Sequence, residues 1–285
     1  MSLVDLILEP LQYDFMVRAL LVTAIAAVVG AVLSCWLVLI GWSLMGDAVS
    51  HAVLPGIVLA YVFGLPFAIG ALVFGLVAVG LIGAVSGTSR VKEDAAIGIV
   101  FTTLFALGLV LVSVVPSQVD LSHILFGNIL GVSASDVVQV GVLAAIALAV
   151  LVIKRRDLVL YAFDPLHARA LGLSPRRLAT LLLVLLAVVA VVGLQVVGVV
   201  LVVALLIIPG ATAHLLTDRF SRMLLIAPVM SSLCSVAGIY LSYWLNASSG
   251  GLVVVVQGVV FALVYLLSPR HGLVRRWRRT RTVPV

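Results

Sequence analysis

One carboxylate and one imidazole stand four residues apart in a strongly apolar part of the chain. Asp47 and His51 are flanked on both sides by long apolar runs. On a helix this spacing places both side chains on one face. Ionisable groups at membrane depth are energetically unfavourable and mark functional sites. Carboxylate oxygen together with imidazole nitrogen suits manganese, zinc and ferrous iron, whereas calcium and magnesium prefer oxygen alone. The spacing therefore predicts a transition-metal site at Asp47 and His51.

Two ligands do not complete a coordination shell, so the pair needs further partners. A homodimer would bring a second carboxylate and a second imidazole to the same twofold axis. Pro55 and Gly56 follow the pair directly, and such interruptions expose backbone carbonyls at binding sites in transporters. The alternative interpretation is structural: Asp47 caps the start of a helix, and His51 bonds a neighbouring carbonyl group.

Two other polar segments are secondary candidates for metal binding or gating. Glu93 and Asp94 begin a predicted helix, where Asp94 suits the N-cap position, although either carboxylate could instead turn inward as a ligand. Asp120 and His123 lie in a predicted extracellular loop, where they could collect a cation or simply be solvated.

A polar segment further along the chain has the pattern of a short surface helix. Asp164 precedes Pro165, which is the arrangement that opens a helix, and Gly172 stands where such a helix would end. Ala168 and Gly172 have the spacing of a small-residue face on which another protein could dock. The alternative is a simple connector at the membrane surface.

The composition of the whole chain indicates how these residues are held. Of the 285 residues, 64% are hydrophobic and 10% are charged, far more apolar than a soluble domain. A membrane crossing needs about 20 apolar residues. Breaks at polar, Gly and Pro residues leave nine apolar stretches: 15–41, 47–63, 66–86, 95–115, 137–153, 178–192, 196–216, 223–245 and 252–268. We expect an all-α polytopic membrane protein forming one transmembrane domain over 1–285. It has nine transmembrane helices, or eight if the second stretch is broken or re-entrant.

Basic residues indicate the orientation of these stretches. The formal net charge is +6, and topology explains the clustering of Lys and Arg in the short breaks better than nucleic-acid binding does. With the basic tail 269–285 in the cytoplasm, the segment 154–177 lies on the same side and only Arg18 among the basic residues lies outside. Residues 1–14 are acidic and lack the basic region of a cleavable signal peptide, so we expect the first span to be retained.

Glycines within one stretch predict close helix packing. Gly70, Gly75, Gly80 and Gly83 recur along 66–86, and small residues allow helix backbones to approach each other in lipid. Another pair of glycines flanks a predicted turn at 193–198.

Absent motifs exclude some activities. The sequence has no G-x-x-x-x-G-K-[ST] phosphate loop and no H-E-x-x-H pair, so it should neither hydrolyse ATP by itself nor act as a zinc protease. Cys35 and Cys234 both lie in apolar runs, where we expect them to pack rather than form disulfides. We therefore expect a protein that is not an enzyme.

Several of these segments together resemble the ABC-3 family of permeases, the membrane subunits of prokaryotic manganese, zinc and iron ABC importers. The resemblance rests on residues 46–56, 93–98, 125–128, 164–172 and 204–213. The first segment is highly specific and each of the others is weaker.

The resemblance implies a homodimeric permease in the lipid of a prokaryotic cytoplasmic membrane. Its implied partners are cytoplasmic ATPase subunits and an extracytoplasmic metal-binding protein that delivers the ion. Asp47 and His51 match the family's intramembrane metal-contacting positions, and the segment from Asp164 to Gly172 is similar to its coupling helix. We expect the cargo to be Mn, Zn or Fe, favouring Mn or Zn, with no permanently bound cofactor. The alternative is a stand-alone ion-coupled secondary metal transporter in which Asp47 is the coupling residue.

Overall fold

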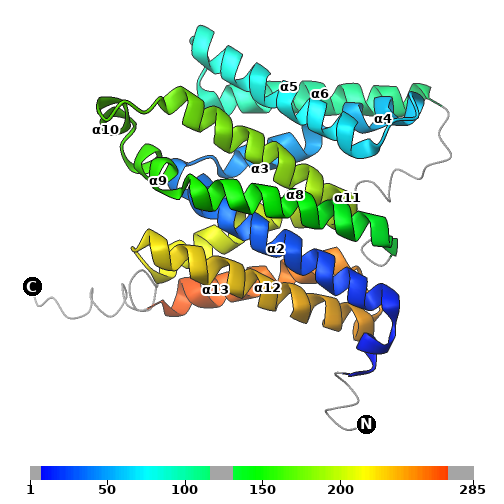
Figure 1. Ribbon diagram of the computed structural model, residues 1–285. Coiled ribbons are helices and arrows are strands. Elements are labelled where there is room, and N and C mark those ends of the chain that lie inside the picture. Colours follow the sequence, from blue (N-terminus) through cyan, green and yellow to red (C-terminus); the bar gives the residue numbers. More distant parts are fainter. Residues whose placement is uncertain (1–7, 116–130, 269–285) are drawn as a thin grey trace, which may run out of the picture.

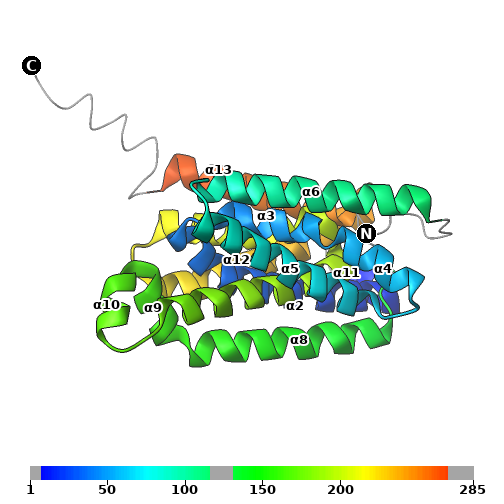
Figure 2. The ribbon, with the colours of Figure 1, turned by 90° about the horizontal axis from the view of Figure 1, so that it is seen from above.

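The computed structural model describes residues 8–115 and 131–268, and within these ranges all regular structure is helical. The long helices run back and forth across a single bundle (Figure 1). They are α2 (Asp14–Ile40), α5 (Phe67–Thr88), α6 (Glu93–Val114), α8 (Ala134–Ile153), α11 (Pro175–Leu216), α12 (Phe220–Leu245) and α13 (Ser249–Leu267). A short 3-10 helix, η1 (Pro10–Gln12), precedes α2. Figure 2 shows α6 and α8 along opposite flanks of the bundle.

The second predicted span is broken into two helices. α3 (Ser43–Ala52) and α4 (Leu54–Val62) meet at Val53, and proline occupies the first turn of α4, where its missing N–H costs no helical hydrogen bond. Together they form an apolar segment of 20 residues. The segment begins at Ser43 rather than at Asp47 as predicted.

The longest helix contains a second break. At Gly198 in α11 the backbone leaves helical geometry, with φ 79° and ψ 165°, a conformation that favours glycine. The break divides α11 into the apolar halves Pro175–Leu194 and Val197–Leu216, which confirms the predicted turn. With α11 counted as two, the described ranges hold nine helical segments long and apolar enough to cross a membrane. The predicted all-α polytopic fold is confirmed.

Two short helices gather at one end of the bundle. α9 (Arg155–Phe163) and α10 (Pro165–Ala170) lie on the left in Figures 1 and 2, at the same end as the α5–α6 connection and the beginnings of α11 and α12. We call this the basic end, because its described residues include Arg90, Lys92, Lys154, Arg155, Arg156, Arg169, Arg176, Arg177, Arg219 and Arg222.

Glycines at one crossing bring α4 and α5 into direct backbone contact. A Cβ atom at Gly56 would overlap the carbonyl oxygen of Gly70, and a Cβ atom at Gly70 would overlap that of Gly56. Gly75 also faces a neighbour, since its Cβ atom would lie 3.3 Å from a side chain of α11. The packing prediction is therefore confirmed for Gly70 and Gly75. It is wrong for Gly80 and Gly83, where an added Cβ atom would meet nothing within 4 Å.

We predict that Gly70→Ala lowers the thermal unfolding midpoint of the purified protein in detergent. The added methyl group must push α4 and α5 apart, and overpacking of this kind costs about 1–3 kcal/mol. Gly141→Ala on α8 is the control, since its Cβ atom would meet nothing within 4 Å. An equal midpoint in the two variants would contradict the close crossing.

Candidate metal site

Asp47 and His51 lie one helical turn apart inside α3. His51 Nε2 is 3.4 Å from Asp47 Oδ1, and the two side chains are 25% and 38% exposed, respectively. α3 begins at Ser43, with Trp42 at its N-cap and no side-chain capping bond. The alternative interpretation of Asp47 as a helix cap is therefore wrong. A carboxylate and an imidazole at this distance have the right chemistry to bind one transition-metal ion.

The pair occupies the open face of α3. Met45, Ala48 and Val49 on the other faces are at most 2% exposed, because α3 packs on α5 and α11, while α6 covers one side of His51. Leu44 is 60% exposed and precedes Asp47 by three residues, so it continues the same stripe along the helix. The two candidate ligands thus lie on the least buried stripe of α3, although the imidazole also packs against α6.

Two phenylalanines of α6 pack against the imidazole. The ring centroid of Phe105 lies 5.2 Å from that of His51 at an interplanar angle of 79°, and Phe101 lies 5.4 Å away at 55°. His51 Nδ1 is buried and has no hydrogen-bond partner among the described residues. Metal-binding histidines usually donate their second ring N–H to an acceptor. Here aromatic packing restricts the ring instead.

Sequence reasoning missed this aromatic pair. Phe101 and Phe105 have the same i,i+4 spacing as Asp47 and His51, which is the one signal that places them on a common helix face. Nothing in the spacing indicates which helix that face meets.

A small space beside His51 is lined mainly by apolar side chains. A cavity of about 10 Å³ adjoins the imidazole, which is about the smallest volume that holds one water molecule. Its apolar lining comes from α4, α6 and both halves of α11, and includes Leu54, Ile57, Phe105, Leu194 and Val199. We call these five residues the apolar collar. Val199 directly follows the break at Gly198, so the collar lies where α11 changes direction.

The other predicted ligands do not join the pair within the described structure. Lys92, not Asp94, is the N-cap of α6, so the capping prediction for Asp94 is wrong. Asp94 is exposed in the first turn. The side chain of Glu93, together with Asp120 and His123, lies outside the described residues. Among the described residues, no group of three or more His, Cys, Asp or Glu side chains is placed to hold a metal ion.

The predicted surface helix forms as α10. The Asp164 carboxylate accepts a hydrogen bond of 2.9 Å from the backbone N–H of His167, and Pro165 occupies the first turn. Gly172 takes the left-handed conformation, with φ 80°, just after the helix. The sequence-based boundaries of this element are therefore confirmed.

The prediction that Ala168 and Gly172 form a small-residue docking face is wrong for Ala168. Ala168 is fully buried, because this face of the short helix turns toward the chain itself. The exposed large apolar residues of the segment 164–172 are Leu166, at 77%, and Leu171, at 63%.

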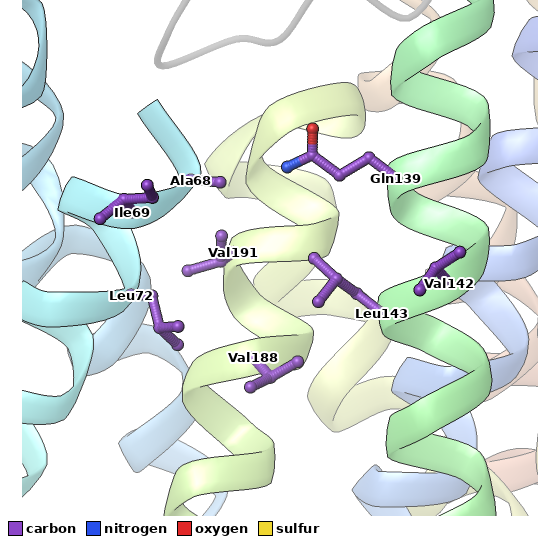
Figure 3. A pocket seen from close by; sticks show the side chains of 8 residues that line it. All are labelled: Ala68, Ile69, Leu72, Gln139, Val142, Leu143, Val188 and Val191. Carbon is purple, nitrogen blue, oxygen red and sulfur yellow. The ribbon is translucent and has the colours of Figure 1, made fainter. Parts of the chain in front are cut away.

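A separate apolar hollow lies between α5, α8 and α11, toward the end opposite the basic end (Figure 3). Its volume is about 390 Å³, and Gln139 is the one polar side chain among its described lining residues. This described lining has neither a carboxylate nor an imidazole, so we do not treat the hollow as a candidate metal site. Its lining residues are Ala68, Ile69, Leu72, Gln139, Val142, Leu143, Val188 and Val191.

Comparison with known proteins identifies the family. The ABC 3 transport family matches residues 12–268 of the chain. The chain belongs to this family. Its membrane-spanning fold and its recognition as an ABC-3 permease are thereby confirmed.

Similar proteins of known name match nearly the whole length of the chain. The manganese transport system membrane protein MntB of Synechocystis is 50% identical over 274 residues, which cover 96% of this chain and 90% of that protein. The chelated iron transport system membrane protein YfeC of Yersinia pestis is 44% identical, covering 98% and 95%. The structure of PsaBC from Streptococcus pneumoniae in complex with Fab superposes with a TM-score of 0.88 at 36% identity, covering 99% and 100%.

We predict that Phe105→Leu weakens Mn²⁺ binding to the purified protein by roughly tenfold, the lower range for removing an outer-shell partner of a metal ligand. Loss of the edge-to-face contact frees the His51 ring to rotate. Equilibrium dialysis measures the dissociation constant. Phe261→Leu removes a comparable ring, stacked on Tyr265 in α13, and should leave binding unchanged. Equal affinities in the two variants would show that the α6 ring does not position His51.

Proposed function

We propose that this chain is the membrane subunit of an ABC importer that passes a divalent transition metal, Mn²⁺ or Fe²⁺, through the bundle. The observation that carries the proposal is the Asp47–His51 pair on the open face of a membrane-spanning helix. Relatives named for manganese and iron transport support these two cargoes. The ion is the substrate rather than a resident cofactor, so the affinity of the site must be low enough for the ion to be released.

A homodimer would complete the site. Each chain offers one carboxylate and one imidazole, while transition-metal sites hold at least four ligands. Because Leu44, Asp47 and His51 all lie on the open face of α3, an isologous contact around a twofold axis would set two such faces opposite each other. The shared site would then have two carboxylates and two imidazoles.

The direction of α3 determines which of the two residues the ion would meet first. α3 begins at the basic end, so an ion arriving from the opposite end meets His51 first and Asp47 about 6 Å further on, at ~1.5 Å per helical residue. The apolar collar borders His51 on the side toward the interior of the chain, so the ion would reach the pair from the open face of α3. The positive-inside rule makes the basic end cytoplasmic and the direction inward.

The arrangement of α10 suits an ATPase partner in the cytoplasm. Leu166 and Leu171 project apolar side chains from the basic end, where a soluble subunit would bury them. The first half of α11 follows α10 after a short connection and packs on α3, since a Cβ atom at Gly46 would lie 3.8 Å from Leu186. Movement of α10 upon ATP binding would therefore reach the metal pair through α11. An extracytoplasmic metal-binding protein would deliver the ion at the opposite end.

We predict that Asp47→Asn and His51→Gln each lower metal uptake at least tenfold in proteoliposomes that hold the permease, its ATPase and its binding protein. Both changes keep side-chain size but remove a charged or basic ligand atom. Uptake of radioactive Mn²⁺ and Fe²⁺, measured with and without ATP, reports the effect and names the cargo.

Matched controls separate the site from general charge effects. Asp94→Asn and His214→Gln change the same residue types at exposed positions and should retain uptake. Normal uptake in Asp47→Asn and His51→Gln, with ATP hydrolysis intact, would refute the assignment of the pair. Uptake that proceeds under an ion gradient without ATP would instead support a secondary transporter.

We predict that Leu166→Ser reduces co-purification of the ATPase subunit and ATP-driven uptake together, because it removes an apolar contact from the interface. Burying a leucine side chain stabilises an interface by about 1.5–3 kcal/mol, so a loss of tenfold or more in affinity is expected. Val91→Ser, an exposed apolar position in the α5–α6 connection, is the control. Co-purification that is unchanged by Leu166→Ser would contradict the docking role of α10.

A further inference from the structure

An open groove separates α5 from α11 at the basic end of the bundle. Its volume is about 810 Å³, and it runs along α5 from Val79 to Thr88, with the beginning of α11 as the opposite wall. Trp42 and Met45 also line it. Neither residue of the metal pair lines the groove, so its role is independent of the proposed metal passage.

The groove is apolar in its deeper part and cationic at its mouth. Val79, Ile82 and Leu183 line the part within the bundle, and Arg176 lines the part at the basic end. Arg176 is exposed in the first turn of α11. Within the described ranges, no carboxylate lies within salt-bridge distance of its guanidinium group.

Glycines keep the groove open. Gly80, Gly83 and Gly87 all line it, and an added Cβ atom at each would meet nothing within 4 Å. These glycines therefore do not serve contact between α5 and α11. They leave room that no described residue fills.

The groove begins at the membrane surface and reaches into the apolar layer. From Thr88 to Val79 it follows α5 for about 14 Å, at ~1.5 Å per residue, within the candidate span Phe67–Thr88. Beside its mouth the rings of Trp42 and Tyr161 lie 6.5 Å apart. Tryptophan and tyrosine gather where a membrane meets water, which places the mouth at headgroup level.

The chemistry of the groove favours one class of occupant. A segment of a soluble subunit would bring unsatisfied backbone groups into hydrocarbon, and a small anion would leave the apolar walls uncovered. We propose that this groove binds an anionic phospholipid, with an acyl chain against the glycine face of α5 and the phosphate beside Arg176. Basic pockets between membrane helices on the cytoplasmic side recognise such headgroups. The bound lipid would contact Trp42 and Met45, at the start of the helix that carries Asp47.

The hollow of Figure 3 provides an internal contrast. It opens between the same two helices toward the opposite end, but its polar lining residue is the uncharged Gln139. A lipid chain there would have no cationic partner, so selectivity for charge is expected only at the basic end.

Placing a large side chain in the groove tests whether a lipid occupies it. The full-length protein is reconstituted into phosphatidylcholine vesicles containing a minority of phosphatidylglycerol, then extracted in mild detergent, and the retained phospholipid is counted by native mass spectrometry. Gly83→Leu places a side chain in the open space and should remove the retained lipid. Gly141→Leu adds the same side chain at an equally open position on α8 and should leave retention as in the wild type.

Removing the positive charge of Arg176 tests whether the groove selects an anionic headgroup. Arg176→Gln should lower the preference for phosphatidylglycerol over phosphatidylcholine about fivefold, the worth of one basic residue near a membrane surface. Arg222→Gln, also exposed at the basic end, should keep the wild-type preference. Added inorganic phosphate should not displace the lipid, since it lacks the chain that fills the apolar part.

Three outcomes would overturn the proposal. Retention in Gly83→Leu equal to that in Gly141→Leu would mean that lipid does not occupy the groove. Displacement by inorganic phosphate would identify an anion site without a chain. Unchanged lipid in Gly83→Leu with loss of ATPase co-purification would assign the groove to a protein partner.

Discussion

Placing a carboxylate and an imidazole inside a membrane-spanning bundle costs free energy that neighbouring groups must offset. This requirement explains much of the surrounding structure. Asp47 and His51 lie within ion-pair distance of each other, so each provides a polar neighbour in a region that offers few others. Rings of α6 cover the imidazole, while the remaining faces of α3 are packed with small and apolar side chains. The pair is left on the open face, and no third His, Cys, Asp or Glu side chain of the described residues joins it, so a metal site there would need further ligands.

Breaks in two helices lie beside this pair. α3 ends just after His51, and α4 continues the span with its own axis, held against α5 by the contact of Gly56 with Gly70. α11 is interrupted at Gly198, next to the apolar collar. Both breaks adjoin the cavity of about 10 Å³ beside His51. Helix ends that meet at one small apolar cavity can shift relative to each other without unfolding a continuous helix, which would suit a transporter whose helices move around the metal pair.

Local chemistry was predictable from the sequence, whereas contacts between helices were not. The spans follow from apolar length, α10 follows from Asp164 and Pro165, and the pairing of Asp47 with His51 follows from helical spacing. Asp94 was misplaced because α6 begins two residues earlier than predicted, so that Lys92, which makes no side-chain capping bond, takes the N-cap position. The burial of Ala168 and the rings around His51 depend on which helices pack together, which composition and periodicity leave open. The same holds for glycines: Gly70 meets a neighbouring backbone and Gly83 faces open space, although both lie on one helix.

In the proposed transporter each chain carries half of a metal site that two copies complete. The stoichiometry of Mn²⁺ bound to the purified, dimeric permease tests this sharing, determined by titration followed with electron paramagnetic resonance. We expect one tightly coordinated ion for every two chains, with nitrogen and oxygen ligands, and loss of that ion when His51 is replaced by Gln in both copies. One ion for each chain, or an ion with an unchanged spectrum after the replacement, would contradict a shared site at Asp47 and His51.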